Sequence, residues 1–246
     1  MLENKSDFSF FYRDEREYKL NVPDNSNFEM QNHRDFLFDI SLTYKAMPYY
    51  VVKEGIKVPR YGMNMTPAIT LGYKKAIPLN GFDSDFDLIS ISVKQKLKVG
   101  YKSNISYMVE GGYFMNDKTV FFDDFRHFST QPLVLGVKEF FPVKQFGDYY
   151  RYSTDAGFAE AHFVYQTPFL LLKRLPLIRN RMWDESLMFN YIYTPEYQNS
   201  FEFGYGVGNY FYNVGLFAGF EDSKFSTVGL RVSLSVFGRK EIVIGM

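Results

Sequence analysis

Residues 89–101, with the sequence ISISVKQKLKVGY, decide the fold, because apolar and polar side chains alternate along them. Every second side chain of an extended strand points to the same face. The apolar face would carry Ile89, Ile91, Val93, Leu97, Val99 and Tyr101, and the opposite face Ser90, Ser92, Lys94, Lys96 and Lys98. The stretch therefore predicts a long strand with one apolar and one polar face.

The same alternation recurs along the chain, in residues 36–45, 69–74, 105–113, 159–165, 187–193, 201–207, 210–220 and 227–236. Several segments sustain it over a length typical of transmembrane strands, roughly 9–11 residues, rather than the 5–6 of soluble ones. An apolar, aromatic face opposite a polar one is the pattern of outer-membrane barrels. We expect an all-β, antiparallel transmembrane β-barrel with about 10–12 strands in this chain, which forms the barrel alone or as part of a larger one.

The expected organisation is one barrel over residues 35–237, preceded by an arm or first strand in 1–34 and followed by a tail in 238–246. The last long strand ends at Phe237, which resembles the aromatic-terminated final strand of outer-membrane barrels. The first residues contain no apolar stretch typical of a signal peptide. We therefore expect the chain to be a mature product, a truncated reading frame or a piece of a longer protein.

The composition favours a membrane surface over nucleic acid. The 28 basic residues balance 28 acidic ones, whereas proteins that bind nucleic acid usually carry a basic excess. The 27 Phe and 20 Tyr suit the lipid-facing and headgroup zones of a barrel. The absence of Cys excludes a disulfide framework and a thiolate metal site.

Polar residues on the expected lumen face are the candidates for function, and they are Lys94, Lys96, Lys98, Glu110, Glu160, His162 and Arg231. The three lysines could form an anion-attracting wall. Alternatively, lumen carboxylates such as Asp39, Glu110 and Glu202 compensate their charge.

No catalytic residue, metal ligand or cofactor is predicted. The three histidines, His33, His127 and His162, show no metal-binding spacing. Glu160 and His162 share a face and could form a proton relay, although ordinary lumen hydrogen bonds explain the pair better. A Ser–His pair would need a serine within hydrogen-bond reach, and the sequence singles out none.

Residues 169–183 combine apolar and basic side chains, and they include Lys173, Arg174, Arg179 and the only tryptophan, Trp183. An amphipathic segment at the membrane interface has this composition, with tryptophan as its anchor. A loop that folds back into the barrel would have the same mixed apolar and basic composition.

Three further stretches carry a resemblance to a known family: FFDDFRHF at 121–128, YYRYSTD at 149–155, and EAH at 160–162 followed by FLLLKRLPLIR at 169–179. In order and spacing over about residues 115–237, the chain resembles the C-terminal barrel of an uncharacterised Gram-negative outer-membrane family. Its longer members carry an N-terminal carboxypeptidase-regulatory-like β-sandwich, which is a non-catalytic module. The chain departs from the family at Gln166-Thr167-Pro168, where members tend to have an Asn-Gly turn.

The resemblance and the two-faced strands together predict a non-enzymatic barrel of the bacterial outer membrane, with a role in transport or as a scaffold for envelope or surface proteins. Membrane lipid, and other outer-membrane or periplasmic proteins, are the expected partners. A barrel enzyme acting on lipid is one alternative. A soluble lipocalin-like binder is the other, and it requires the aromatic face to point inward.

Overall fold

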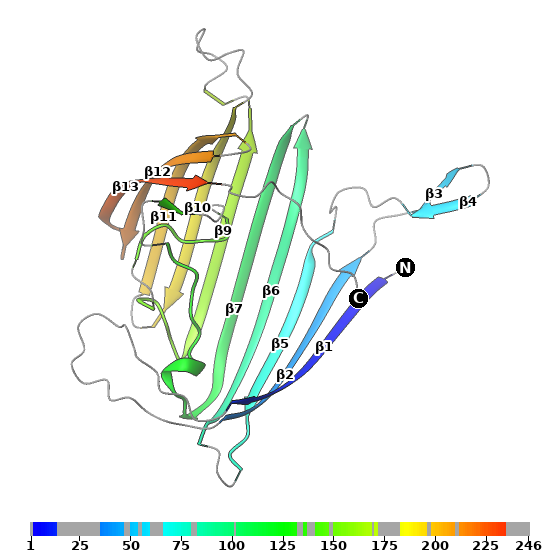
Figure 1. Cartoon of the computed structure of the whole chain (residues 1–246), viewed down its shortest axis with the longest axis vertical. Coiled ribbons are helices and arrows are strands. Elements are labelled where there is room, and N and C mark those ends of the chain that lie inside the picture. Colours follow the sequence, from blue (N-terminus) through cyan, green and yellow to red (C-terminus); the bar gives the residue numbers. More distant parts are fainter. Residues whose placement is uncertain are drawn as a thin grey trace.

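The computed structural model describes residues 2–13, 35–46, 50–53, 56–59, 66–79, 83–100, 102–131, 135–136, 141–147, 150–168, 170–171, 183–195, 198–209 and 212–234. These residues form an all-β structure dominated by one large sheet (Figure 1). No helix among them is long and apolar enough to cross a membrane.

The sheet has eleven strands in the order β1-β2-β5-β6-β7-β9-β10-β11-β12-β13-β8, so that all but the last follow one another as in the chain. They are β1 (Leu2–Arg13), β2 (Asp35–Ala46), β5 (Ala68–Ala76), β6 (Asp85–Gly100), β7 (Ser103–Thr119), β8 (Leu135–Gly136), β9 (Gly157–Thr167), β10 (Asp184–Thr194), β11 (Gln198–Gly208), β12 (Tyr212–Glu221) and β13 (Lys224–Leu234). A separate hairpin consists of β3 (Tyr50–Lys53) and β4 (Ile56–Pro59). Apart from the two-residue β8, neighbours in the sheet are antiparallel.

The side chains divide between two faces as the alternation predicts. On the outer face, Ile91 and Leu230 remain 50% and 51% exposed although both are large and apolar. On the opposite, inner face, Glu160, His162 and Glu202 are almost completely buried. In a soluble protein, by contrast, charged side chains are seldom fully buried, and large apolar ones seldom line an exposed face together.

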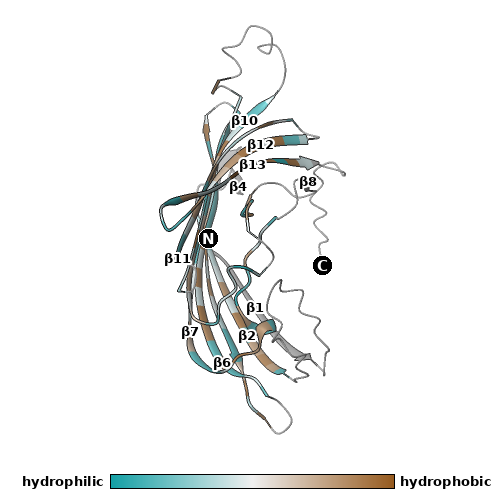
Figure 2. Ribbon diagram, turned by 90° about the vertical axis from the view of Figure 1, so that its left-hand side faces the viewer, coloured by the Kyte–Doolittle hydropathy of each residue, from teal (hydrophilic) through white to brown (hydrophobic). Residues whose placement is uncertain are grey.

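The expectation of a closed barrel is not met, because the described sheet is curved but open (Figure 2). One edge strand is β1, and the far side of β13 pairs with β8 in parallel through Val232 and Ser233. Among the described residues, β13 therefore does not pair with β1. Alternation assigns each side chain to a face, but it does not determine whether the two edges of a sheet meet.

The described parts of the connection between β7 and β9, within residues 120–156, lie on the concave inner face, and we call them the inner segment (Figures 1 and 2). It contains the 3-10 helix η1 (Phe122–Asp124). Its apolar side chains pack against the sheet, with Phe128 and Tyr152 in one cluster with Phe158 and Ile192. A second cluster on the inner face joins Val164, Met188 and Phe217, and Phe141 and Phe146 of the inner segment pack against it.

Candidate functional site

Arg126 of the inner segment links two carboxylates of the sheet. Its Nη2 lies 2.9 Å from Glu110 Oε1 on β7 and 3.1 Å from Glu160 Oε2 on β9. The guanidinium also stacks over the Phe158 ring, with 5.1 Å between its carbon and the ring centroid. The two carboxylates are neighbours in the β7–β9 register, and the partly buried cation between them lowers their mutual repulsion.

His162 continues this network into the C-terminal strands. Its Nε2 is 2.7 Å from Glu160 Oε1, and its Nδ1 is 2.8 Å from Asn190 Oδ1. The Asn190 amide nitrogen donates to the carbonyl of Val143 and to Glu202, so the Asn190 oxygen must face the histidine as an acceptor. The Nδ1 of His162 then donates to this oxygen. Glu110, Arg126, Glu160 and His162 thus form one connected polar network.

Glu202 on β11 anchors the middle of the inner segment. Its two carboxylate oxygens accept the backbone N–H groups of Gln145 and Phe146, at 2.8 and 2.7 Å. Arg231 on β13 donates its Nε to the carbonyl oxygen of Gln145 at 2.9 Å and lies over the Phe146 ring. The sheet therefore supplies the hydrogen-bond partners that this irregular, buried stretch of backbone requires.

Lys144, which precedes these residues, is also buried. Its ammonium group hydrogen-bonds Ser200 Oγ and lies 4.2 Å from the centroid of the Tyr152 ring. Burial lowers the pKa of Lys144 to about 8, and burial raises the pKa of Tyr152 to about 12. Both shifts express the cost of charging a group that water does not reach.

The Glu160–His162 pair is therefore part of the attachment of the inner segment. His162 is 1% exposed and Glu160 is 3% exposed, and both ring nitrogens have protein partners. A general base must reach the proton that it abstracts from a substrate. The contacts of both residues are hydrogen bonds and ion pairs to the sheet and to the inner segment.

A second histidine has a serine partner that the sequence did not single out. His127 Nδ1 lies 2.7 Å from Ser153 Oγ, and the ring also donates to the backbone carbonyl of Phe122. Burial lowers the pKa of His127, which favours the neutral ring. The His127 ring contacts the rings of Phe122 and Tyr150, with centroids at 5.1 and 5.0 Å, and these two rings also contact each other at 5.3 Å.

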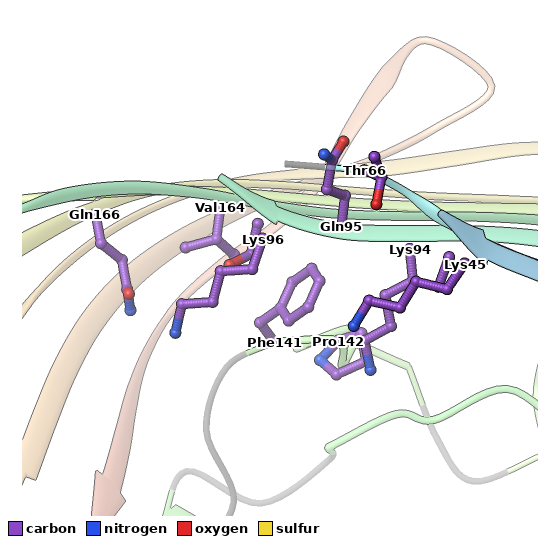
Figure 3. A pocket seen from close by; sticks show the side chains of 11 residues that line it. Lys45, Thr66, Lys94, Gln95, Lys96, Phe141, Pro142, Val164 and Gln166 are labelled. Atoms are coloured by element: carbon purple, nitrogen blue, oxygen red, sulfur yellow. The ribbon is translucent and has the colours of Figure 1, made fainter. Parts of the chain in front are cut away.

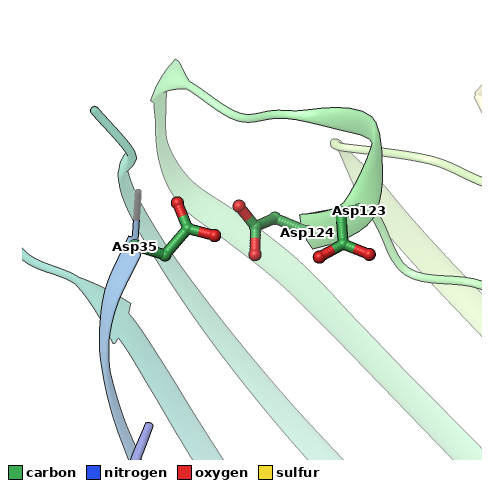
Figure 4. A group of neighbouring side chains, drawn as sticks. All are labelled: Asp35, Asp123 and Asp124. Atoms are coloured by element: carbon green, nitrogen blue, oxygen red, sulfur yellow. The ribbon is translucent and has the colours of Figure 1, made fainter. Parts of the chain in front are cut away.

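Three carboxylates meet where β2 begins and η1 ends (Figure 4). One oxygen each from Asp35, Asp123 and Asp124 lies within 4.8 Å of the others, an arrangement that could hold a metal ion. Ser84 Oγ donates to Asp35 and to Asp124, and Lys74 Nζ is 3.9 Å from Asp124. Because Asp35 is remote in sequence from the other two, spacing could not indicate this cluster.

The inner face of the N-terminal half contains a cavity of about 410 Å³, which we call the lysine pocket (Figure 3). Lys94 and Lys96 line it, together with Lys45 of β2 and Gln166 of β9. Phe141 and Pro142 of the inner segment form its opposite wall. Lys98, the third lysine of the predicted row, does not line the cavity.

The carboxylates expected to compensate the lysine row have other partners or positions. Glu110 binds Arg126, and Glu202 binds backbone N–H groups. Asp39 lies six residues before Lys45 on the same strand, which is about 20 Å in an extended chain. Within the described ranges, no ion pair is found for Lys94 or Lys96.

The structure describes Leu170 and Leu171 near the start of the expected interface segment, and they contact the beginning of β10. Leu170 and Leu171 donate their backbone N–H groups to Glu185, at 3.0 and 2.7 Å, and Tyr205 donates its hydroxyl to the same carboxylate. Leu171 is 56% exposed. Trp183 is half-buried, whereas Lys173, Arg174 and Arg179 lie outside the described residues, as do His33, Phe237 and the tail 238–246.

Sequence reasoning missed the partners that connect these sites, namely Lys45, Arg126, Lys144, Ser153, Gln166 and Asn190. A signal was present for two of them, because Arg126 and Ser153 lie within the stretches at 121–128 and 149–155 that carry the resemblance. These stretches form much of the inner segment. The stretches that carry the resemblance therefore include residues that hold the inner segment in place.

The structural class of this chain is therefore an open antiparallel sheet. Its outer face is apolar, and its inner face is polar and partly covered by the inner segment. The chain belongs to a family of unknown function, DUF5686, whose C-terminal domain model matches residues 1–207. The match begins well before residue 115, where the resemblance was expected to start, and ends within β11, before β12 and β13. No curated protein and no solved structure matches the chain.

Proposed function

We propose that this chain forms the wall of an outer-membrane β-barrel, in a longer protein or assembly, and that the inner segment narrows the lumen. The observation that carries the proposal is the pair of faces: exposed apolar side chains outside, and a buried polar network inside. A bilayer covers an apolar surface of this kind, whereas water penalises it. The ten antiparallel strands of the sheet have 9 to 17 residues, enough to cross a bilayer.

The proposed role is non-enzymatic, in transport or as a scaffold for envelope or surface proteins. A lumen that contains an attached segment suits passage controlled by that segment, or presentation of a bound protein. The proposal includes the bacterial outer membrane as the location, and a non-catalytic N-terminal β-sandwich as the module of longer family members. A soluble lipocalin-like binder fits less well, because Ile91 and Leu230 point away from the inner face.

The chain has no cysteine, so single cysteines can report the environment of each face. We propose Ile91→Cys and Leu230→Cys for the outer face and Lys96→Cys for the inner face, each labelled with a fluorophore after reconstitution into liposomes. Brominated acyl chains should quench the two outer labels, and aqueous iodide should quench the inner one. Heat-modifiable migration in detergent would report a folded sheet. Quenching of Lys96→Cys by lipid, with Ile91→Cys open to iodide, would refute the proposal.

One observation favours a second candidate, an enzyme that hydrolyses lipid esters. Ser153 and His127 are within hydrogen-bond distance, and His127 is oriented by the carbonyl of Phe122. In such a reaction His127 takes the hydroxyl proton while Ser153 attacks the ester carbonyl. The same contact also joins two stretches of the inner segment, a structural role that needs no substrate.

Phospholipid hydrolysis by the reconstituted chain separates these roles. A catalytic role predicts measurable hydrolysis that Ser153→Ala abolishes and that the exposed control Ser129→Ala leaves unchanged. No hydrolysis by the unmodified chain, or the same rate in Ser153→Ala, removes the enzyme from consideration.

A further inference from the structure

We propose that the lysine pocket binds an amphiphilic phosphate, meaning a phosphate group carried on an apolar body. The inference goes beyond the transport or scaffold role, because it assigns a ligand class to a specific cavity. It rests on the pocket and not on the membrane assignment.

The strand register explains why a cavity exists between the lysines. Lys45 on β2 and Lys94 on β6 both pair with Ala68, which lies between them on β5. Lys96 pairs with Ser106 on β7, which in turn pairs with Val164 on β9. Alanine and serine are short, so the long lysine side chains border an open space rather than a packed layer.

The charge of the pocket is strongly positive. Three ammonium groups border one cavity, and within the described part of the chain none of the three has a carboxylate at ion-pair distance. The side chains of Lys94 and Lys96 are exposed, and they extend from the sheet on the side of the cavity (Figure 3). Like charges in one cleft attract counter-ions and raise their local concentration.

The lining matches an anion with an apolar body. Lysine binds phosphate as a point charge with three donors, and the Ser106 hydroxyl and the Gln166 amide add hydrogen-bonding groups to the same cavity. Phe141 and Pro142 present apolar surface from the inner segment, opposite the lysines (Figure 3). The volume of about 410 Å³ exceeds that of a lone phosphate and lies in the range of small-molecule pockets.

The Lys98 position provides a matched control. Lys98 follows Lys96 on the same strand and face, is exposed like it, and does not line the cavity. If the lysines of β6 acted only as a general anion-attracting wall, the loss of any of the three would weaken phosphate binding equally. If the lysine pocket is the binding site, phosphate binding should depend on Lys94 and Lys96 and not on Lys98.

The test uses the full chain in a non-ionic detergent, titrated in a calorimeter with hexyl phosphate or with inorganic phosphate. Hexyl phosphate should bind more tightly than inorganic phosphate. The double variant K94Q/K96Q should weaken hexyl phosphate binding by about tenfold or more, because hydrogen bonds to charged groups contribute strongly. K98Q should change it by less than about twofold, and F141A should weaken hexyl phosphate but not inorganic phosphate.

Heat-modifiable migration identical to that of the unmodified chain would show that each variant folds. Absence of hexyl phosphate binding by the folded, unmodified chain would overturn the proposal, as would equal losses in K98Q and K94Q/K96Q. Equal affinity for the two probes would assign the pocket to free phosphate and overturn the amphiphilic ligand. None of these results changes the quenching pattern that tests the membrane proposal, so the two can fail separately.

Discussion

The two halves of the sheet share a polar inner face but use it differently. In the N-terminal half, Lys94 and Lys96 face an open cavity. In the C-terminal half, His162, Asn190 and Glu202 occupy equivalent inward positions and are each 1% exposed beneath the inner segment. The polar alternation is the same in both halves, so the difference comes from what lies on top of the strands.

The same alternating sequence pattern therefore leads to two physical environments, one covered by the inner segment and one open to a cavity. Where the inner segment covers the sheet, each polar group needs a protein partner, because an unsatisfied buried group is costly. Where the inner segment leaves a cavity above the strands, as at the lysine pocket, water can solvate the lysines and no protein partner is required. The covered half should therefore contribute to stability, and the open half should contribute to binding.

The largest expected effect is the loss of Glu202 in the covered half. Glu202→Ala leaves the buried backbone N–H groups of Gln145 and Phe146 without acceptors, and it should lower the free energy of unfolding by about 3–5 kcal/mol. Denaturant unfolding of the detergent-solubilised chain would measure the loss.

Glu221→Ala is the matched control for Glu202. Glu221 binds Arg151 at the surface, where an ion pair contributes about 1 kcal/mol or less. Similar losses in the two variants would contradict the attachment role of Glu202.

A second prediction concerns the tight packing of the covered half. A Cβ at Gly204 would lie 2.4 Å from a carbon of the Phe217 ring, whereas at Gly111 the nearest atom would be 3.5 Å away. Gly204→Ala should therefore destabilise the fold by about 1–3 kcal/mol, and Gly111→Ala should stay within about 0.5 kcal/mol of the unmodified chain. Thermal unfolding of both variants would check this, and a destabilised Gly111→Ala would argue against the packing difference.

The third prediction is a pH dependence that arises from Lys144 and Tyr152. The folded-state pKa of Lys144 is about 8, below the ordinary lysine value of 10.5, so between these values the unfolded chain binds more protons and stability should rise with pH. The folded-state pKa of Tyr152 is about 12, above the ordinary tyrosine value of 10.0, so from pH 10 to 12 the folded chain retains the proton and stability should fall.

Unfolding free energies measured from pH 7 to 12 would show a rise followed by a fall. Lys144→Met should remove the rise between pH 8 and 10.5, while the exposed control Lys118→Met should retain it. A rise that persists in Lys144→Met would assign it to another group.

The alternation in residues 89–101 was sufficient to predict long antiparallel strands and the face of each side chain. Period-two patterning determines the faces because neighbouring side chains of a strand must diverge. The closed barrel was not found in the described sheet, because closure depends on which strands meet at the edges. β8 of the inner segment occupies the edge of β13, and no local pattern in Leu135–Gly136 indicates that pairing.

The polar contacts were less predictable than the strands. Glu160 and His162 were recognisable as a pair because they are two residues apart on one strand. Arg126, Asn190 and Glu202, which determine what that pair does, come from three other parts of the chain. Their meeting depends on the path of the inner segment over the sheet, and sequence spacing does not encode that path.

The smallest expected effect, and the sharpest contrast with Glu202, comes from the open half. K94Q/K96Q removes two exposed charges that form no ion pair with the described residues, so the free energy of unfolding should change by no more than about 0.5 kcal/mol. Relief of the repulsion between the lysines would make any change a gain rather than a loss. Denaturant unfolding under the conditions used for Glu202→Ala gives the direct comparison. A loss close to that of Glu202→Ala would mean that the lysines support the sheet, and the division between a covered half for stability and an open half for binding would not hold.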